Sequence, residues 1–206
     1  MDITLKYYEE YAEKFFKETV EIDMRTFYDI FEQYLLSGSS ILDLGCGSGR
    51  DSKYFLNKGY RVISIDGSPR MCKLASEFIG KEVQCKKFNE ICYKNEFDGI
   101  WASASLLHVP KRDLKLIFRL LYKALKDNGY MYVSFKSGEY EGEIDGRYYT
   151  YLSCSDLFNL IDGEFEIVAK MKTKDLRLES YNNKWVNIIL KKISKNEIMC
   201  GNRVLS

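Results

Sequence analysis

A short apolar run followed by closely spaced glycines constrains the fold more than any other part of this 206-residue chain. Residues 41–50 read ILDLGCGSGR, with the acid Asp43 just before glycines at positions 45, 47 and 49. Glycine tolerates backbone conformations and close approaches that a Cβ would block. A buried strand, a glycine turn and a following helix form a cradle in which a ligand lies against bare backbone, near the positive helix N-terminus. The segment predicts a nucleotide-type cofactor site; the alternative is a glycine turn without a ligand.

The spacing of the glycines separates this site from two other nucleotide-binding motifs. A dinucleotide fingerprint requires GxGxxG, but the third glycine comes one position early, at Gly49, and Arg50 occupies the expected place. No Gly-Lys-Ser/Thr follows, which excludes a P-loop. Asp66 comes about 20 residues beyond the glycine turn, at the end of the next predicted strand, where an acid can accept hydrogen bonds from ribose hydroxyls.

Composition and charge limit the class of partner. Lys and Arg total 31 against 30 Asp and Glu, so a net charge of +1 creates no global attraction to nucleic acid or to an anionic membrane. Six cysteines without a CxxC pair, and a single histidine, provide no cluster of metal ligands, and we predict no metal. Scattered cysteines suit a reducing compartment, and neither a signal peptide nor a membrane-spanning run is visible. We expect one cytoplasmic domain; the sequence does not indicate an oligomeric state.

Hydrophobic periodicity predicts an α/β domain. Two helices, covering residues 8–16 and 27–35, precede the first strand, and strands then alternate with helices. This order implies a parallel, doubly wound sheet. The expected later strands are 61–65, 82–85, 97–102, 130–135, 165–173 and 184–192, and the expected helices are 51–58, 68–80, 111–125 and 153–161. Residues 136–150 are polar and glycine-rich, which is typical of a loop over a site.

The string DLGCGSG at residues 43–49 resembles motif I of the class I S-adenosylmethionine (SAM) dependent methyltransferases. The acid at Asp66, the strand FDGIW at 97–101, the segment LLHVP at 106–110 and the turn DNG at 127–129 extend the likeness. The resemblance implies a Rossmann-like seven-stranded sheet with N-terminal helices and an antiparallel final strand. It also implies SAM as cofactor and S-adenosylhomocysteine as product.

A narrower likeness is to small bacterial methyltransferases of the tellurite-resistance type. It rests on SFK at residues 134–136 together with GRY at 146–148. The resemblance divides the single domain 1–206 into an N-terminal helical lid (1–38), a Rossmann-like core (39–192) and a tail (193–206). The N-terminal aromatic residues are then either core packing or a cover over the cofactor.

The resemblance also implies which residues form the cofactor site. Asn89 stands where relatives usually have an aspartate beside the adenine, and an asparagine can still hydrogen-bond the adenine edge. The implied cofactor-binding residues are Asp43, Gly45, Cys46, Gly47, Ser48, Gly49, Arg50, Asp66, Gly67, Ser68, Met71, Phe88, Asn89, Ala102 and Ser103.

Methyl transfer to a thiol or an amine can require a base, and His108 is the candidate. It follows the fourth strand, at the sheet edge where ligands bind in such folds, and histidine titrates closest to neutral pH. The alternative is that His108 only bonds to backbone or orients its loop. We expect Tyr11, Lys136, Arg147 and Tyr148 to bind the acceptor.

The sequence narrows the range of possible methyl acceptors mainly by excluding some classes. No NPPY-like or DPPY-like motif follows Ile100, and there is no Pro-Cys nucleophile for cytosine chemistry. A small molecule is the first expectation, an RNA such as tRNA the second, and a SAM-binding protein without catalysis the third. Arg147 either clamps a carboxylate or phosphate of the acceptor, or pairs with an acid of its own segment: Glu139, Glu141 or Asp145.

Overall fold

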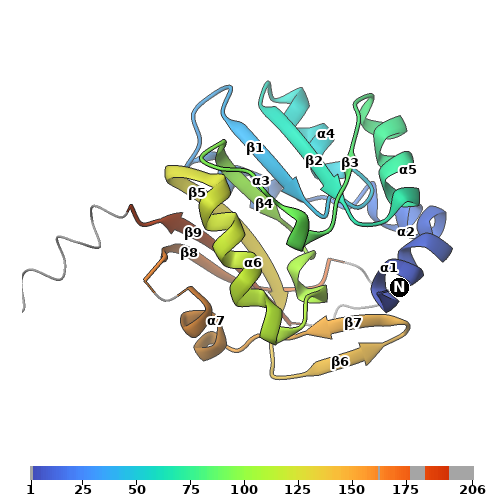
Figure 1. Ribbon diagram of the computed structural model, residues 1–206. Helices are drawn as coiled ribbons and strands as arrows, with labels where there is room; N and C mark the ends of the chain where they lie inside the picture. Colours follow the sequence, from blue (N-terminus) through green and yellow to red (C-terminus); the bar gives the residue numbers. More distant parts are fainter. Residues whose placement is uncertain (1, 162, 177–183, 195–206) are drawn as a thin grey trace, which may run out of the picture.

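Seven strands form one sheet in the order β3-β2-β1-β4-β5-β9-β8 (Figure 1). The structure is a computed structural model and describes residues 2–161, 163–176 and 184–194. The strands are β1 (Ser40–Leu44), β2 (Arg61–Asp66), β3 (Gln84–Cys85), β4 (Phe97–Ala102), β5 (Leu125–Lys136), β6 (Glu141–Ile144), β7 (Arg147–Thr150), β8 (Phe165–Lys174) and β9 (Lys184–Lys192). The helices are α1 (Ile3–Glu10), α2 (Ala12–Thr19), α3 (Arg25–Glu32), α4 (Arg50–Asn57), α5 (Pro69–Ile79), η1 (Phe88–Glu90), η2 (Leu106–His108), α6 (Lys111–Ala124) and α7 (Cys154–Ile161).

Strand direction confirms the expected doubly wound sheet. Strands β3, β2, β1, β4 and β5 pair in parallel, whereas β9 runs antiparallel to both β5 and β8. The chain reverses its direction of winding between β1 and β4, and in such sheets ligands bind at this point, outside the carboxyl ends of the strands.

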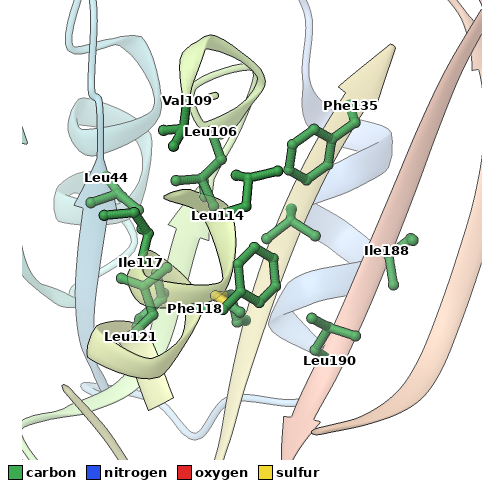
Figure 2. Close-up of a cluster of buried hydrophobic side chains, with 14 of the residues drawn as sticks. Leu44, Leu106, Val109, Leu114, Ile117, Phe118, Leu121, Phe135, Ile188 and Leu190 are labelled. Carbon is green, nitrogen blue, oxygen red and sulfur yellow. The ribbon is translucent and has the colours of Figure 1, made fainter. Parts of the chain in front are cut away.

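Buried side chains of the central strands alternate between the two faces of the sheet, as the strand period of two requires. On the face covered by α6, Phe118 and Leu121 pack with Leu44, Phe135 and Ile188 (Figure 2). Helix α6 lies in front of the sheet in Figure 1, and α3 and α4 lie behind it. The sheet is therefore covered by helices on both faces.

Helix α3 belongs to the core of the second face. Its Phe31 is fully buried and packs with Phe55 of α4 and with Trp101 of β4. Trp101 in turn stacks on Tyr132 of β5, with ring centroids 3.9 Å apart. Such buried aromatic contacts add roughly 0.5–1.5 kcal/mol each beyond area burial. Of the segment expected to form a lid, only α1 and α2 therefore remain outside this aromatic cluster.

The N-terminal segment differs from the expected two helices, because it contains three. The first two are separated at Tyr11, whose φ of −111° and ψ of 20° leave the helical range. The Asp2 side chain caps the first helix by accepting a hydrogen bond from the Thr4 N–H. The break lets α1 contact both α5 and β7 while α2 packs along α5.

Residues 136–150 are not a loop, so that prediction was wrong. Strands β6 and β7 form an antiparallel hairpin whose two-residue turn is Asp145-Gly146. Both turn residues have positive φ, 49° and 75°, and Asp-Gly is a preferred pair for such tight turns. The hairpin lies beside α1 (Figure 1), and its strand β7 contacts both α1 and η2.

Two further expectations concerned membrane-spanning segments and the C-terminal tail. No helix in the described ranges is long and apolar enough to span a membrane. The predicted tail is described only at Ile193 and Ser194, and residues 195–206 lie outside the described part.

Candidate active site at the carboxyl edge of the sheet

A cavity of about 570 Å³ opens at the carboxyl ends of β1, β2, β4 and β5. Its volume lies within the range of small-molecule sites, roughly 300–1,000 Å³. The strand ends contribute Gly45, Asp66, Ser103 and Lys136 to the lining. Residues of α1, α2, η2, β7 and β9 also line it, as do residues of α3, α5, α6 and β8. One cavity thus joins the glycine segment to the hairpin.

The glycine turn has the bare backbone that the sequence predicts. Gly45 and Gly47 have φ of 71° and 54°, in the left-handed region. A Cβ on Gly45 would lie 2.7 Å from the Cβ of Ser105, and one on Gly47 would lie 3.3 Å from the ring of Phe15. The Gly45 N–H also donates to the Ile65 carbonyl at 2.9 Å, which fastens the turn to β2. A side chain at Gly45 would therefore move the cavity wall.

Gly49 has a different task from the other two glycines. It does not line the cavity, and a Cβ there would lie 2.7 Å from Cδ1 of Ile79 on α5. Its φ of 78° places it at the cap of α4, with no side-chain capping bond. Gly49 thus allows α4 and α5 to pack closely and does not contact the cavity.

Asp66 lines the cavity and is already bonded to the two loops beside it. Its Oδ2 accepts from the Gly47 N–H at 3.0 Å, and its Oδ1 accepts from the Ser68 N–H at 2.9 Å. Burial raises the pKa of the Asp66 carboxyl, although the backbone N–H groups oppose this shift. Because each carboxylate oxygen has more than one acceptor position, Asp66 can bind a ligand while it holds the turn.

Asp43 lies beneath the turn and does not line the cavity. Its carboxylate accepts from the Ser52 hydroxyl at 2.5 Å, on the α4 side of the sheet. Burial raises its pKa, and the charge of the neighbouring Asp51 raises it further. The observed contacts of Asp43 therefore lie below the turn. Its predicted role beside the cofactor stays a prediction.

Two further predicted residues also lie off the cavity. Ser68 caps α5 by accepting from the Met71 N–H at 3.1 Å, and Ala102 is fully buried in the sheet. The predicted cofactor residues that do line it are Gly45, Cys46, Gly47, Ser48, Arg50, Asp66, Gly67, Met71, Phe88, Asn89 and Ser103.

Asp51 is a cavity residue that the sequence reasoning missed. Arg50 donates to it through Nε at 2.6 Å, Trp101 donates through Nε1 at 2.8 Å, and the Tyr28 hydroxyl donates as well. Burial alone would raise the pKa of Asp51, but the charge and hydrogen bonds of Arg50 hold it below its usual range. The adjacent pair Arg50-Asp51 directly after the glycines was the available signal.

His108 is held on both ring nitrogens. Its Nδ1 lies 2.7 Å from the Tyr148 carbonyl oxygen, and its Nε2 lies 3.0 Å from the hydroxyl of Tyr8. A carbonyl only accepts, so Nδ1 carries the proton, and in the neutral ring Nε2 accepts from the Tyr8 O–H. Burial raises the pKa of Tyr8, and the nearby charge of Arg147 opposes that shift. Both His108 and Tyr8 line the cavity.

Two cations gather around Tyr149 at the hairpin end of the cavity. The Lys136 Nζ lies 4.5 Å from the Tyr149 ring centroid, and the Arg147 Cζ lies 5.4 Å from the same centroid. Arg147 also lies 4.4 Å from the centroid of Tyr7. The predicted acceptor residues Lys136 and Arg147 both line the cavity, together with Tyr149.

The other two predicted acceptor residues do not reach the cavity. Tyr11 is 42% exposed and packs on Tyr7, whereas Tyr8 and Phe15 line the wall. The Tyr148 hydroxyl donates to Glu141 at 2.8 Å on the outer side of the hairpin. Because strand side chains alternate, Arg147 and Tyr149 face the cavity and Tyr148 faces away. Reading residues 147–150 as a strand would have found Tyr149.

The glycine turn, the acid after β2 and the sheet order define a Rossmann-like protein that binds a nucleoside-type cofactor. Its residues fit SAM, because Gly45 and Gly47 leave room for a ligand against backbone and Asp66 offers acceptors. In the described ranges, no group of His, Cys, Asp or Glu could hold a metal ion. Residues 41–129 match a family model described as a methyltransferase domain. This part of the chain therefore carries a methyltransferase domain, and the fold around it is that of SAM-dependent methyltransferases.

Known relatives agree with this family. An uncharacterized methyltransferase of Staphylococcus carnosus is 25% identical over 152 residues, which cover 64% of this chain and 73% of that protein. The 18S rRNA (guanine-N(7))-methyltransferase of Schizosaccharomyces pombe is 30% identical over 104 residues, covering 44% of this chain. The chain spans only 39% of that longer relative.

Solved structures agree on the fold. The 1,6-didemethyltoxoflavin-N1-methyltransferase of Burkholderia thailandensis, with bound S-adenosylhomocysteine, superposes with a TM-score of 0.73 at 21% identity. The match covers 92% of this chain and 85% of that one. A TehB-like SAM-dependent methyltransferase of Corynebacterium glutamicum gives 0.70 at 16% identity, over 91% of this chain and 99% of that one. These matches show the fold, and the narrower likeness to the tellurite-resistance type stays a prediction.

Proposed function

We propose that this methyltransferase acts on a small molecule, bound in the part of the cavity between η2, β5 and the β6–β7 hairpin. The observation that carries the proposal is the continuity of one cavity from the glycine turn to His108, Lys136 and Arg147. A cofactor in the turn and an acceptor near the hairpin would then share one enclosed space. Holding two reactants in line is the main requirement of methyl transfer.

The chain's own residues divide the work of binding. When bound, SAM supplies a methyl group on a sulfonium sulfur, which is transferred by in-line displacement. We propose that Gly45 and Gly47 admit the cofactor against backbone and that Asp66 accepts from its ribose hydroxyls. Met71, Phe88 and Asn89 line the same part of the cavity and would flank the adenine. Ser103 would face the reacting end.

We propose that α1 and α2 are the lid that excludes water. Leu5 and Phe15 lie against Gly67 and Gly47, directly over the two loops of the cofactor part. The lid is fastened to α5 by exposed contacts, an ion pair from Glu13 to Arg70 and a hydrogen bond from the Arg70 N–H to Glu9. Exposed ion pairs contribute little, about 0–1 kcal/mol, so opening the lid would mainly break the Tyr8–His108 bond and the bond from the Tyr148 N–H to the Thr4 hydroxyl.

Hydrogen exchange over residues 7–19 should slow when SAM is added, because a ligand beneath Phe15 gives the lid a surface to close on. The measurement is exchange by mass spectrometry with and without SAM. Helix α6 serves as an internal control, because its buried face packs in the core and its exchange should change less. Equal protection of residues 7–19 in both states would mean that α1 and α2 are fixed parts of the fold.

We propose that His108 accepts a proton from the acceptor through Tyr8. The Tyr8 hydroxyl donates to Nε2 of His108, and its oxygen keeps lone pairs that can accept from an acceptor X–H group. When the acceptor X–H group gives its proton to the Tyr8 oxygen, Tyr8 can pass its own hydroxyl proton to Nε2 of His108. The Tyr148 carbonyl supports this by holding the proton of His108 on Nδ1.

An RNA acceptor is the second candidate. A relative that methylates 18S rRNA supports it, but it shares only part of its length with this chain. The enclosed position of Lys136, 8% exposed, favours a small molecule, because a phosphate backbone requires cations at the surface. A protein that binds SAM without catalysis would have no use for the polar end of the cavity.

Incubation with methyl-labelled SAM and a pool of cell metabolites should yield a labelled small molecule. Bulk tRNA and rRNA, tested separately, should remain unlabelled. An Asp66→Ala variant in the same reactions controls for contaminating methyltransferases. Label that appears only in RNA would replace the small-molecule acceptor by RNA, and label in neither pool would favour a binding protein.

A further inference from the structure

We propose that the acceptor is a small acid, whose carboxylate or phosphate is bound by Arg147. This inference rests on the proposed function, because it concerns the acceptor in the same cavity. The first observation is that Nε of Arg147 is buried and has no hydrogen-bond partner in the described part of the chain. A buried charged donor left unpaired is unfavourable, and Arg147 lines the cavity. An acceptor oxygen arriving in the cavity would satisfy it.

The acids of its own segment do not neutralise Arg147. Within the described residues Glu141 makes no ion pair with Arg147 and instead accepts from the Lys111 N–H and the Tyr148 hydroxyl, both at 2.8 Å. Asp145 lies in the hairpin turn, two residues before Arg147, but forms no ion pair with it in the described part of the chain. The alternative in which Arg147 only fastens its own hairpin therefore lacks the expected partner.

Aromatic rings fix the guanidinium in place. It lies between Tyr7 of α1 and Tyr149 of the same strand, 4.4 and 5.4 Å from the two ring centroids. Stacking on aromatic faces holds an arginine without using its N–H groups. Arg147 is thus oriented in advance. The Tyr8 hydroxyl takes one of its hydrogen bonds, and the unpaired Nε–H stays available to an anion.

A second cation adds to the positive potential at this end. Lys136 is 8% exposed, lines the cavity and lies 4.5 Å from the centroid of the same Tyr149 ring. Five acids also line the cavity: Asp2, Asp51, Asp66, Asp113 and Asp175. Asp51 is paired with Arg50, Asp66 accepts from the N–H groups of Gly47 and Ser68, and Asp175 accepts from Trp185 Nε1 at 3.1 Å. Lys136 and Arg147, both beside the Tyr149 ring, therefore favour an anionic group at the hairpin end of the cavity, although the net charge of the whole chain is only +1.

Ser105 suggests where the other end of the acceptor lies. Its hydroxyl is the second buried polar group without a partner among the described residues, and it also lines the cavity. Its Cβ is beside Gly45, on the cofactor side. We infer an acceptor with an anionic group at Arg147 and a polar group near Ser105, separated by a ring or short chain that packs on Tyr8 and Phe15.

Binding of simple acids to the complex with S-adenosylhomocysteine tests this directly. The probes are benzoate and phenyl phosphate, with benzamide as the neutral analogue of benzoate, measured by calorimetry or ligand-observed NMR. At least one acid should bind, and benzamide should bind about tenfold more weakly or not at all. Comparing the two acids distinguishes a carboxylate from a phosphate.

Variants identify the residue responsible. Arg147→Gln should weaken binding of the acid about tenfold or more, and Arg147→Lys should recover it only in part, because lysine lacks the two-pronged geometry. Tyr148→Phe is the matched control, since it lies on the same strand but faces away from the cavity. Affinity for S-adenosylhomocysteine should be unchanged in all three variants, which also verifies that they fold.

Three outcomes overturn the inference. They are benzamide binding as tightly as benzoate, acid binding that survives Arg147→Gln, and binding of S-adenosylhomocysteine without binding of either acid. A neutral or cationic metabolite as the labelled product in the screen would also overturn it, while leaving the small-molecule function intact. If the unmodified protein does not bind S-adenosylhomocysteine at all, that result would instead count against the proposed function.

Discussion

Asp66→Ala is expected to lower the affinity for SAM by about tenfold or more. A hydrogen bond to a charged group contributes roughly 1.5–3 kcal/mol, and the ribose hydroxyls would lose this acceptor. The substitution also removes the bonds that Asp66 accepts from the N–H groups of Gly47 and Ser68, at 3.0 and 2.9 Å. The loss should therefore exceed that of one ligand contact. Calorimetric titration with SAM and with S-adenosylhomocysteine measures it.

Asp66→Asn separates the two causes. Asparagine keeps one oxygen for a backbone N–H but loses the charge, so its affinity should fall between those of the unmodified protein and Asp66→Ala. The control is Asp127→Ala, an exposed acid whose side chain is 70% accessible and which lies outside the cavity. Unchanged SAM affinity in Asp66→Ala would remove Asp66 from the cofactor site.

Local sequence patterns predicted the sheet because its strands are short, apolar and separated by clear turn and helix signals. Residues 97–102 and 184–192 were placed at the correct bounds from their apolar runs alone. The hairpin was missed because β6 alternates glutamate with glycine and isoleucine, which buries too little apolar surface to resemble a strand. Its Asp-Gly turn was the stronger signal.

The cofactor part of the site was more predictable than the acceptor part, for a physical reason. Gly45, Gly47 and Asp66 act through backbone geometry at strand ends, which a short motif encodes. Tyr8 and Tyr149 reach the cavity only because α1 packs beside β7, a contact between segments far apart in the chain. The helical period of α1 therefore did not show which of its faces meets the cavity, and the sequence reasoning named Tyr11, which does not line the cavity, and not Tyr8, which does.

Removal of the Tyr8–His108 pair is expected to have the largest effect on catalysis. With a protonated nucleophile as acceptor, His108→Gln and Tyr8→Phe should each lower kcat by about 10²–10⁴-fold, the usual contribution of a positioned base. Tyr8→Phe keeps the ring that packs on Phe15 and removes only the hydroxyl bonded to Nε2. SAM affinity should stay close to that of the unmodified protein, because neither change touches the glycine turn.

The pH profile distinguishes a base from a structural histidine. In the unmodified protein kcat should rise with pH as the imidazole loses its proton, because only the neutral ring can accept one at Nε2. That limb of the profile should disappear in His108→Gln. Tyr11→Phe is the matched control, since Tyr11 directly follows α1 but does not line the cavity. If His108→Gln and Tyr8→Phe both keep the kcat of the unmodified protein and the rise of kcat with pH, His108 serves only to join η2 to the hairpin through its bond to the Tyr148 carbonyl.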